Sequence, residues 1–160
     1  MMRRIELAMT ENEQAVRTFS LPSVAGNERL AAKKIEELLR PLGLSLRLLE
    51  RIKTAVAETA MNAIEHGNRY HEDLPVTIET EITPGSLYIR IADYGGQKDT
   101  PMAEEPDIDA KLAGIQSPRG WGLFLIHRMA DDVRFTTDKE RHTVELTFFL
   151  VREGDSDFSI

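Results

Sequence analysis

The 160-residue sequence predicts an α+β fold in which one mixed β-sheet is covered on one face by α-helices. Two observations predict this class. The elements expected along the chain are a strand, helices, one long helix, two strands, a long irregular segment, a helix and two strands. Moreover, the later strands come in pairs joined by short turns, and antiparallel hairpins grouped beside helices are typical of α+β proteins.

The N-terminal third predicts one strand and two helical segments. Alternating apolar residues over 5–9 indicate a short first strand, and residues 11–19 can form one or two helical turns. Asn27 is a suitable cap for a helix over 28–40, because its side chain can accept a hydrogen bond from a free backbone N–H group. Pro41 and the glycine two residues later should end that helix.

The longest helix is expected over residues 46–66. Ser45 offers an N-cap, and Gly67-Asn68 is a suitable stop. One face carries an apolar stripe that should pack on the sheet, made of Ile52, Ala55, Val56, Thr59, Ala60 and Ala63.

The second half of the chain changes to a period of two. Alternation over 76–82 and 87–91, with Pro84-Gly85 between, predicts a β-hairpin whose second strand leads to Asp93. Residues 94–118 hold several prolines, glycines and acidic residues, and a segment of this length suggests a lid or binding loop.

A helix and a hairpin complete the predicted fold. The helix is expected over 120–130. Strands starting at Val133 and ending near Leu150 should be joined by a turn at 138–140, before a frayed tail at 152–160. We therefore expect one domain over residues 1–151.

Composition excludes several function classes. The net charge of −7 and the pI near 5.2 argue against a nucleic-acid or anionic-membrane surface. The absence of cysteine excludes disulfides and thiolate metal sites. No signal peptide or membrane-spanning segment is expected, and a cytoplasmic monomer or small oligomer is the simplest prediction.

Three polar side chains on the long helix carry the first functional signal. Glu58, Asn62 and His66 are four residues apart, which places them in a row along the flank of the apolar stripe. A carboxylate and a carboxamide beside a packed face are costly to bury unless something pairs with them, and Mg²⁺ with a phosphate chain would do so.

Simpler interpretations of these residues remain open. Asn62 could bond a neighbouring loop, and Glu58 could pair with Lys53 or Arg51 on the surface. His66 could orient phosphates or merely pack at the helix end. A zinc site built from the four histidines is disfavoured, because His66, His71, His127 and His142 lack ligand spacing.

Two further motifs follow in order. Asp93-Tyr94-Gly95-Gly96 comes directly after a strand, where Gly95 allows close approach of the backbone, although a plain turn is also common there. Residues 117–123 place Gly120 and Gly122 at the start of a helix, where backbone N–H groups and the helix dipole favour phosphate. Arg119 can reach terminal phosphates.

Together these motifs and the order of elements resemble the three ATP-binding boxes of the GHKL (histidine-kinase-like) ATPases, and within them the bacterial anti-sigma-factor serine/threonine kinases. The resemblance covers nearly the whole chain. It implies a GHKL sandwich, with Asn62 as Mg²⁺ ligand, Glu58 as general base and Asp93 as acceptor from the adenine amino group. Thr143 corresponds to a threonine near adenine in relatives, but a threonine in a strand needs no special explanation.

The resemblance predicts an ATP- and Mg²⁺-dependent protein serine/threonine kinase. Its substrate would be a STAS-domain anti-sigma-factor antagonist, and it would sequester a sigma factor. A homodimer is an expectation from the family alone. Gln97 and Lys98 replace a glycine and an aromatic residue of the second box. Because of these two replacements, an alternative function remains open, namely an ATP-binding module that switches partners without phosphoryl transfer. A third option is an ATPase part of a larger signalling assembly.

Overall fold

The computed structural model of the protein describes residues 15–96 and 118–150, with side chains described for 16–96 and 121–150. The strands are β1 Ala15–Leu21, β2 Val76–Ile82, β3 Ser86–Asp93, β4 Asp132–Thr137 and β5 His142–Phe149. The α-helices are α2 Asn27–Leu39, α3 Leu46–Asn62 and α5 Pro118–Met129. A 3₁₀ turn, η1 (Arg40–Leu42), precedes α3, and a π-helical turn, η2 (Ala63–Gly67), follows it.

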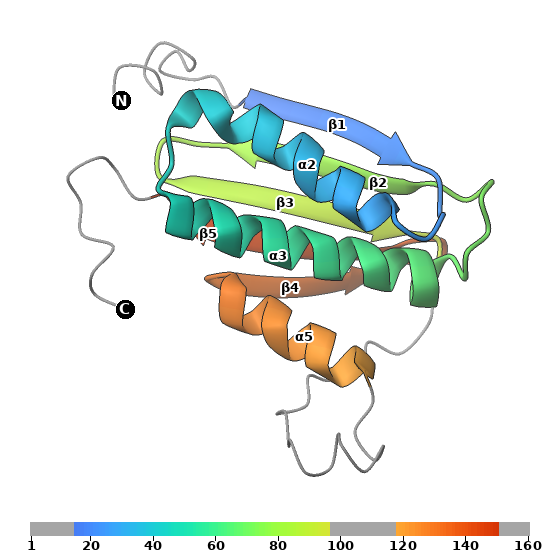
Figure 1. The fold of residues 1–160 in the computed structure, drawn as a ribbon. Helices are drawn as coiled ribbons and strands as arrows, with labels where there is room; N and C mark the ends of the chain where they lie inside the picture. The colour runs from blue at the N-terminus through green and yellow to red at the C-terminus, as the bar shows by residue number, and fades with distance from the viewer. Residues whose placement is uncertain (1–14, 97–117, 151–160) are drawn as a thin grey trace.

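The described strands form one five-stranded sheet in the order β1-β2-β3-β5-β4. The α2 and α3 helices lie side by side on one face of it, and α5 lies beside α3 near β4 (Figure 1). The α+β class is therefore confirmed. All four described pairings are antiparallel, whereas we expected a mixed sheet. The β2–β3 and β4–β5 pairs are hairpins, and β1 and β5 also run opposite to their neighbours.

The expectation for the N-terminal region is wrong in part. Residues predicted to form helical turns instead contribute to β1, where Phe19 pairs with Ile78 of β2. Leu21, at the end of the same strand, is buried in the core. Pairing along the whole length of β2 outweighs a weak local helical preference. The first strand expected at 5–9 lies outside the described residues.

The predicted helix ends hold only in part. The helix expected over 46–66 is α-helical to Asn62 and continues as the π-turn η2, and the helix expected over 120–130 spans Pro118–Met129. Ser45 caps α3, its hydroxyl accepting from the Leu48 N–H at 3.1 Å, as predicted. The cap of α2 is Gly26, with φ of 99°, and not Asn27. The Asn27 carboxamide instead donates to the Pro22 carbonyl at 2.8 Å, which ties the helix start to the end of β1. The α2 helix gives way to η1, which contains Pro41.

The core lies between the three helices and the sheet. The predicted stripe on α3 is confirmed, since all six of its members are less than 5% exposed. Their partners are the inward residues of the strands, which alternate as expected: Ile78, Leu87, Ile89, Ile91, Leu146 and Phe148. Within the described ranges, no helix combines the length and apolarity needed to cross a membrane.

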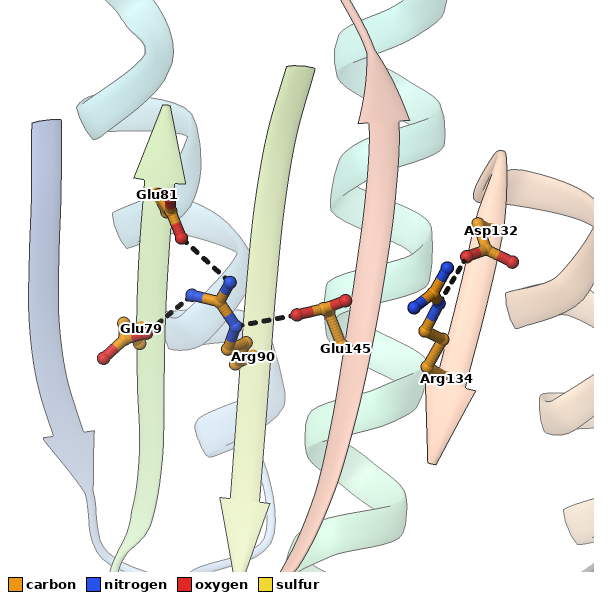
Figure 2. Close-up of polar contacts among 6 residues, drawn as sticks. All are labelled: Glu79, Glu81, Arg90, Asp132, Arg134 and Glu145. Atoms are coloured by element: carbon orange, nitrogen blue, oxygen red, sulfur yellow. Dashed lines mark hydrogen bonds and ion pairs between the residues drawn. The ribbon is translucent and has the colours of Figure 1, made fainter. Parts of the chain in front are cut away.

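The opposite face of the sheet is polar at its centre. Arg90 on β3 donates to Glu79, Glu81 and Glu145 at 2.7–2.8 Å, across three strands (Figure 2). Partial burial lowers the pKa of Arg90, but these three hydrogen bonds outweigh it and raise that pKa overall. The network links β2, β3 and β5 on the face of the sheet opposite to the helices.

Candidate functional site

The first part of the candidate site is the C-terminal end of α3. Glu58 and Asn62 lie on its last two turns, both half-buried. The chain then widens into η2, where the Asn68 N–H donates to the Ala63 carbonyl at 2.8 Å, a five-residue step. A π-turn shifts the residues after it around the helix axis. His66 therefore does not continue the row of Glu58 and Asn62 as a regular helix would place it.

Helix α5 brings Gly122 against this pair. A Cβ atom built on Gly122 would lie 3.0 Å from Glu58 Oε2 and 3.8 Å from Asn62 Oδ1. The sequence motif of residues 117–123 is thus brought to the first motif, about sixty positions earlier in the chain. Any side chain at position 122 would push the Glu58 carboxylate out of this position. Steric contact therefore explains why a glycine stands at position 122.

The far end of the α3–α5 contact is closed by Arg51. Its Nε donates to the Met129 carbonyl at 2.9 Å, and Nη2 pairs with Asp131 Oδ1 at 3.2 Å. The first bond satisfies a carbonyl at the C-terminal end of α5, where a cation is favoured. These contacts of Arg51 hold the two helices together.

The donor atoms beside Gly122 fit Mg²⁺. They are a carboxamide oxygen and a carboxylate oxygen, the hard ligands that this ion prefers. The described residues hold no group of three or more histidine, aspartate or glutamate side chains suited to a metal. Mg²⁺ commonly takes its remaining ligands from water and phosphate.

The second part of the site surrounds Asp93, at the end of β3. This carboxylate is only 5% exposed, and its Oδ1 accepts from the Gly95 N–H at 2.7 Å. The backbone of η2 packs directly on it, since a Cβ on Gly67 would lie 2.2 Å from Asp93 Cγ. Gly95 also approaches closely, because its own Cβ would lie 3.1 Å from Gly67 Cα. The two glycines thus form a cradle around one carboxylate.

Asn68 joins the elements around this cradle, and sequence reasoning treated it only as a helix stop. It is 1% exposed. Its Oδ1 accepts from the Tyr94 N–H at 2.7 Å, and its Nδ2 donates to Ser23 Oγ at 2.9 Å and the Leu74 carbonyl at 3.0 Å. This side chain therefore fixes the end of η2 to the residue after Asp93. The Gly67-Asn68 pair immediately after the first motif was the available signal.

The strand register separates Thr143 from Asp93. Thr143 pairs with Ala92, whereas His142 pairs with Asp93. Directly paired residues share a face and successive residues alternate, so Thr143 lies on the face opposite to Asp93. His142 Nδ1 is 3.6 Å from Asp93 Oδ2. The structure thus brings His142, and not Thr143, to the cradle. The sequence could have indicated His142, because it lies two residues before Val144 in the strand and therefore on the same face.

The turn between β4 and β5 packs against the residues that follow Asp93. Gly96 donates to the Glu140 carbonyl at 3.3 Å, and a Cβ on it would lie 2.6 Å from Glu140 C. Asp138 Oδ1 accepts from the N–H groups of Arg141 and Glu140 at 2.7 and 2.8 Å. These backbone hydrogen bonds, that from Arg141 foremost, lower the pKa of Asp138. The turn predicted at 138–140 is confirmed, and it packs on the second motif.

The remaining predicted residues are placed less fully. Arg119 and Gly120 belong to the first turn of α5, but their side-chain surroundings lie outside the described residues. The same holds for Gln97, Lys98 and most of the expected lid. Trp121 is half-buried on α5. The structure brings the predicted residues into two groups, which we call half-sites. One half-site, at the start of η2, holds Glu58, Asn62 and Gly122, and the other, at its end, holds Asp93, Gly95 and His142.

Several known proteins are similar to this chain. The model of the histidine kinase-like ATPase domain matches residues 21–148. The serine-protein kinase RsbW of Listeria innocua is 29% identical over 128 residues, covering 76% of this chain and 80% of the relative. An anti-sigma F factor of Clostridium botulinum is 30% identical over 122 residues, covering 76% and 84%.

A solved structure supports the fold. The crystal structure of the RsbU and RsbW domains of Rv1364c from Mycobacterium tuberculosis superposes with a TM-score of 0.63 at 18% identity. The match covers 86% of this chain and 33% of that longer one. Since the family model spans most of the sequence and both candidate half-sites, the chain belongs to the histidine kinase-like ATPase family.

Proposed function

We propose that this protein is an ATP-dependent protein serine/threonine kinase of the anti-sigma-factor type. The observation that carries the proposal is the α3–α5 contact, where the Glu58 carboxylate and the Asn62 carboxamide meet Gly122. The relatives named as a serine-protein kinase and an anti-sigma factor support the same class. An enzyme that uses ATP to act on transcription regulators would work in the cytoplasm.

The nucleotide would span the two half-sites along η2. The base would enter the cradle, where Asp93 accepts from the adenine amino group. Guanine carries a carbonyl at that position. Because a carbonyl oxygen and a carboxylate both only accept hydrogen bonds, the two would repel each other and guanine would be rejected. The phosphates would extend toward α5, where the backbone of Gly120 and Gly122 and the Arg119 guanidinium can bind them. His66, at the bend between the half-sites, would line the path.

Asn62 would hold Mg²⁺ through Oδ1. The ion, when bound, would neutralise phosphate charge. Glu58 would accept the proton of the attacking serine or threonine hydroxyl, whose oxygen forms the new bond to the γ-phosphorus. The bond from that phosphorus to the β–γ bridging oxygen breaks, and ADP leaves. Arg119 would stabilise the charge on the transferring group.

The protein partners follow from the kinase class. The acceptor would be a STAS-domain anti-sigma-factor antagonist, and phosphorylation would release it. The freed kinase would then sequester a sigma factor, either as a monomer or as a homodimer. The net charge of −7 is compatible with a partner that carries basic regions.

The test is transfer of radioactive γ-phosphate from ATP to a purified STAS-domain protein. Glu58→Gln should abolish transfer while leaving ADP affinity within about threefold, because the amide keeps the shape and loses the base. Glu50→Gln is the matched control. It changes a glutamate on the same helix whose side chain is 64% exposed, and it should leave transfer unchanged.

Two results would contradict the proposal. If ATP binds and the STAS-domain protein associates but no phosphoprotein forms, the chain is an ATP-binding switch module. If Asn62→Ala leaves Mg²⁺-dependent ATP affinity unchanged in calorimetry, Asn62 is not a metal ligand.

A further inference from the structure

The contact between α3 and α5 has two ends of different kinds. The α5 helix lies at the outer side of the helical layer, next to α3 (Figure 1). At one end of the contact, Gly122 of α5 meets Glu58 of α3 without a side chain of its own. At the other end, Arg51 of α3 binds the last residues of α5 and its exit, at Met129 and Asp131. The two helices therefore run antiparallel along their contact.

Asp131 is a junction between three elements. Its Oδ1 accepts from Arg51 Nη2 at 3.2 Å, and its Oδ2 accepts from the Phe149 N–H of β5 at 2.7 Å. Its own N–H donates to the Thr147 carbonyl at 2.9 Å. Arg51 adds a second bond of 2.9 Å, from Nε to the Met129 carbonyl. We call these contacts of Arg51 and Asp131 the clamp, and they tie the C-terminal end of α5 to both α3 and β5.

The clamp fixes orientation as well as distance. A guanidinium presents its donors in a rigid planar fork, so binding two acceptors at once restricts the angle between the elements that carry them. The Arg51 and Asp131 side chains are only 27% and 26% exposed, which limits competition from water. The Gly122 end of the contact has no side chain that could make such a bond. The clamp is therefore the end of α5 that directional bonds hold in place.

A rigid helix connects the clamp to the phosphate half-site. Gly122 and Met129 are two helical turns apart, about 10 Å along the axis. Between them, Leu123 and Ile126 are buried in the core. Apolar burial keeps the helix on the core but is non-directional, so it determines the tilt of α5 less strictly than the clamp does. A tilt of about 3° at the clamp would move Gly122 by about 0.5 Å relative to Glu58.

We propose that Arg51 and Asp131 are positioning residues for phosphoryl transfer, because their clamp sets the tilt of α5 and so places Gly122 against Glu58. This inference rests on the proposed function, since it concerns the phosphate half-site. It gives a role to two residues that lie outside the three sequence motifs.

Opening the clamp should affect transfer more than nucleotide binding. Hydrogen bonds from backbone N–H groups to phosphate oxygens tolerate lengths over a range of about 0.5 Å. The attack on the γ-phosphorus is less tolerant, since a 1 Å misplacement of reacting groups can cost about a hundredfold in rate. A shift of about 0.5 Å therefore predicts a loss of about tenfold in kcat, with little change in the KM for ATP.

Lys53 supplies the matched control. It also stands on α3, and its Nζ pairs with Glu36 of α2 at 2.8 Å, with both side chains 30% exposed. This ion pair resembles that of the clamp in burial and joins the same helix to a neighbour, but the neighbour is α2 and not α5. A general weakening of helix packing would appear in variants of both pairs, whereas a change in the tilt of α5 would appear only in variants of the clamp.

The test is steady-state transfer of radioactive γ-phosphate from ATP to a STAS-domain protein, catalysed by the full chain. Arg51→Met removes the donors of the clamp and keeps an unbranched stem, and it should lower kcat about tenfold while the KM for ATP stays within about threefold. Asp131→Asn keeps an acceptor for the Phe149 N–H and removes the charge that faces Arg51, so it should lower kcat as well. Lys53→Met should keep kcat within about twofold of wild type.

The double variant shows whether the two residues act as one unit. Because both work through the same contact, Arg51→Met combined with Asp131→Asn should lower kcat by no more than about twofold beyond the larger single loss. If the two single losses instead multiply, the residues act separately and the clamp is refuted.

The remaining outcomes separate this inference from the proposed function. An unchanged kcat in Arg51→Met, or an equal loss in Lys53→Met, would overturn the positioning role and leave the proposed function intact. Absence of transfer by the wild-type protein would overturn the proposed function, and this inference with it. If Arg51→Met does not fold, Asp131→Asn decides alone, since asparagine has the size and shape of aspartate; a wild-type kcat in that variant would refute the proposal.

Discussion

Gly122→Ala separates the stability of the fold from the chemistry of the site. The new methyl group would point at the Glu58 carboxylate, 3.0 Å from Oε2, and would lie 3.8 Å from Asn62 Oδ1. Ordinary van der Waals contacts begin near 3.4 Å. The carboxylate must therefore move by about 0.4 Å, whereas the carboxamide need not move.

The two effects on stability nearly cancel. Replacing glycine by alanine inside a helix stabilises it by about 1 kcal/mol, and forcing the end of a flexible side chain off its preferred rotamer costs about the same. Catalysis lacks such compensation. Since a 1 Å misplacement can cost about a hundredfold in rate, a displacement of about 0.4 Å predicts a five- to tenfold loss of phosphoryl transfer.

The assay measures thermal unfolding and phosphorylation of a STAS-domain protein on the same preparation. Gly85→Ala is the matched control, because a Cβ there meets nothing within 4 Å. The melting temperature of Gly122→Ala should stay close to that of wild type while its transfer rate falls. A Gly122→Ala protein that phosphorylates at the wild-type rate would refute the role of Glu58 at this contact.

Three further predictions follow from the second half-site. Gly67→Ala should remove ADP binding in calorimetry and destabilise the fold by about 1–3 kcal/mol, because its Cβ would overlap the Asp93 carboxylate; unchanged affinity would contradict the cradle. Asn68→Ala should cost about 3 kcal/mol in urea unfolding, since it leaves buried groups unpaired, and a loss below about 0.5 kcal/mol would disagree. Asp138→Ala should lower the melting temperature at neutral pH. Because the folded pKa of Asp138 is lowered, its contribution is present above about pH 4 and lost as pH falls through that folded pKa, so the difference from wild type should shrink in acid.

Much of the fold could be predicted because its signals are local. The α3 stripe, the Ser45 cap and the two hairpins follow from periodicity and from hydrogen bonds between residues close in sequence. The β1 strand was missed for the complementary reason. Residues 15–21 adopt extended structure by pairing with β2, about sixty positions later, and no local pattern reports that partner.

The candidate site shows the same division. Glu58, Asn62, Asp93 and the glycines are identifiable because they stand in ordered motifs on predicted elements. That Gly122 touches Glu58 depends on how α5 packs on α3. The role of Asn68 also depends on packing, because its partners come from three separate segments.

The amino-acid sequence by itself determined the helices, the hairpins and the order of the three motifs, since these depend on neighbours within a few positions. Only the tertiary structure decided that His142 and not Thr143 faces Asp93, and that the π-turn after Asn62 brings Gly67 onto that carboxylate. The physical reason is that a one-residue step in a strand reverses the face of every side chain, and this register is set by pairing with distant strands.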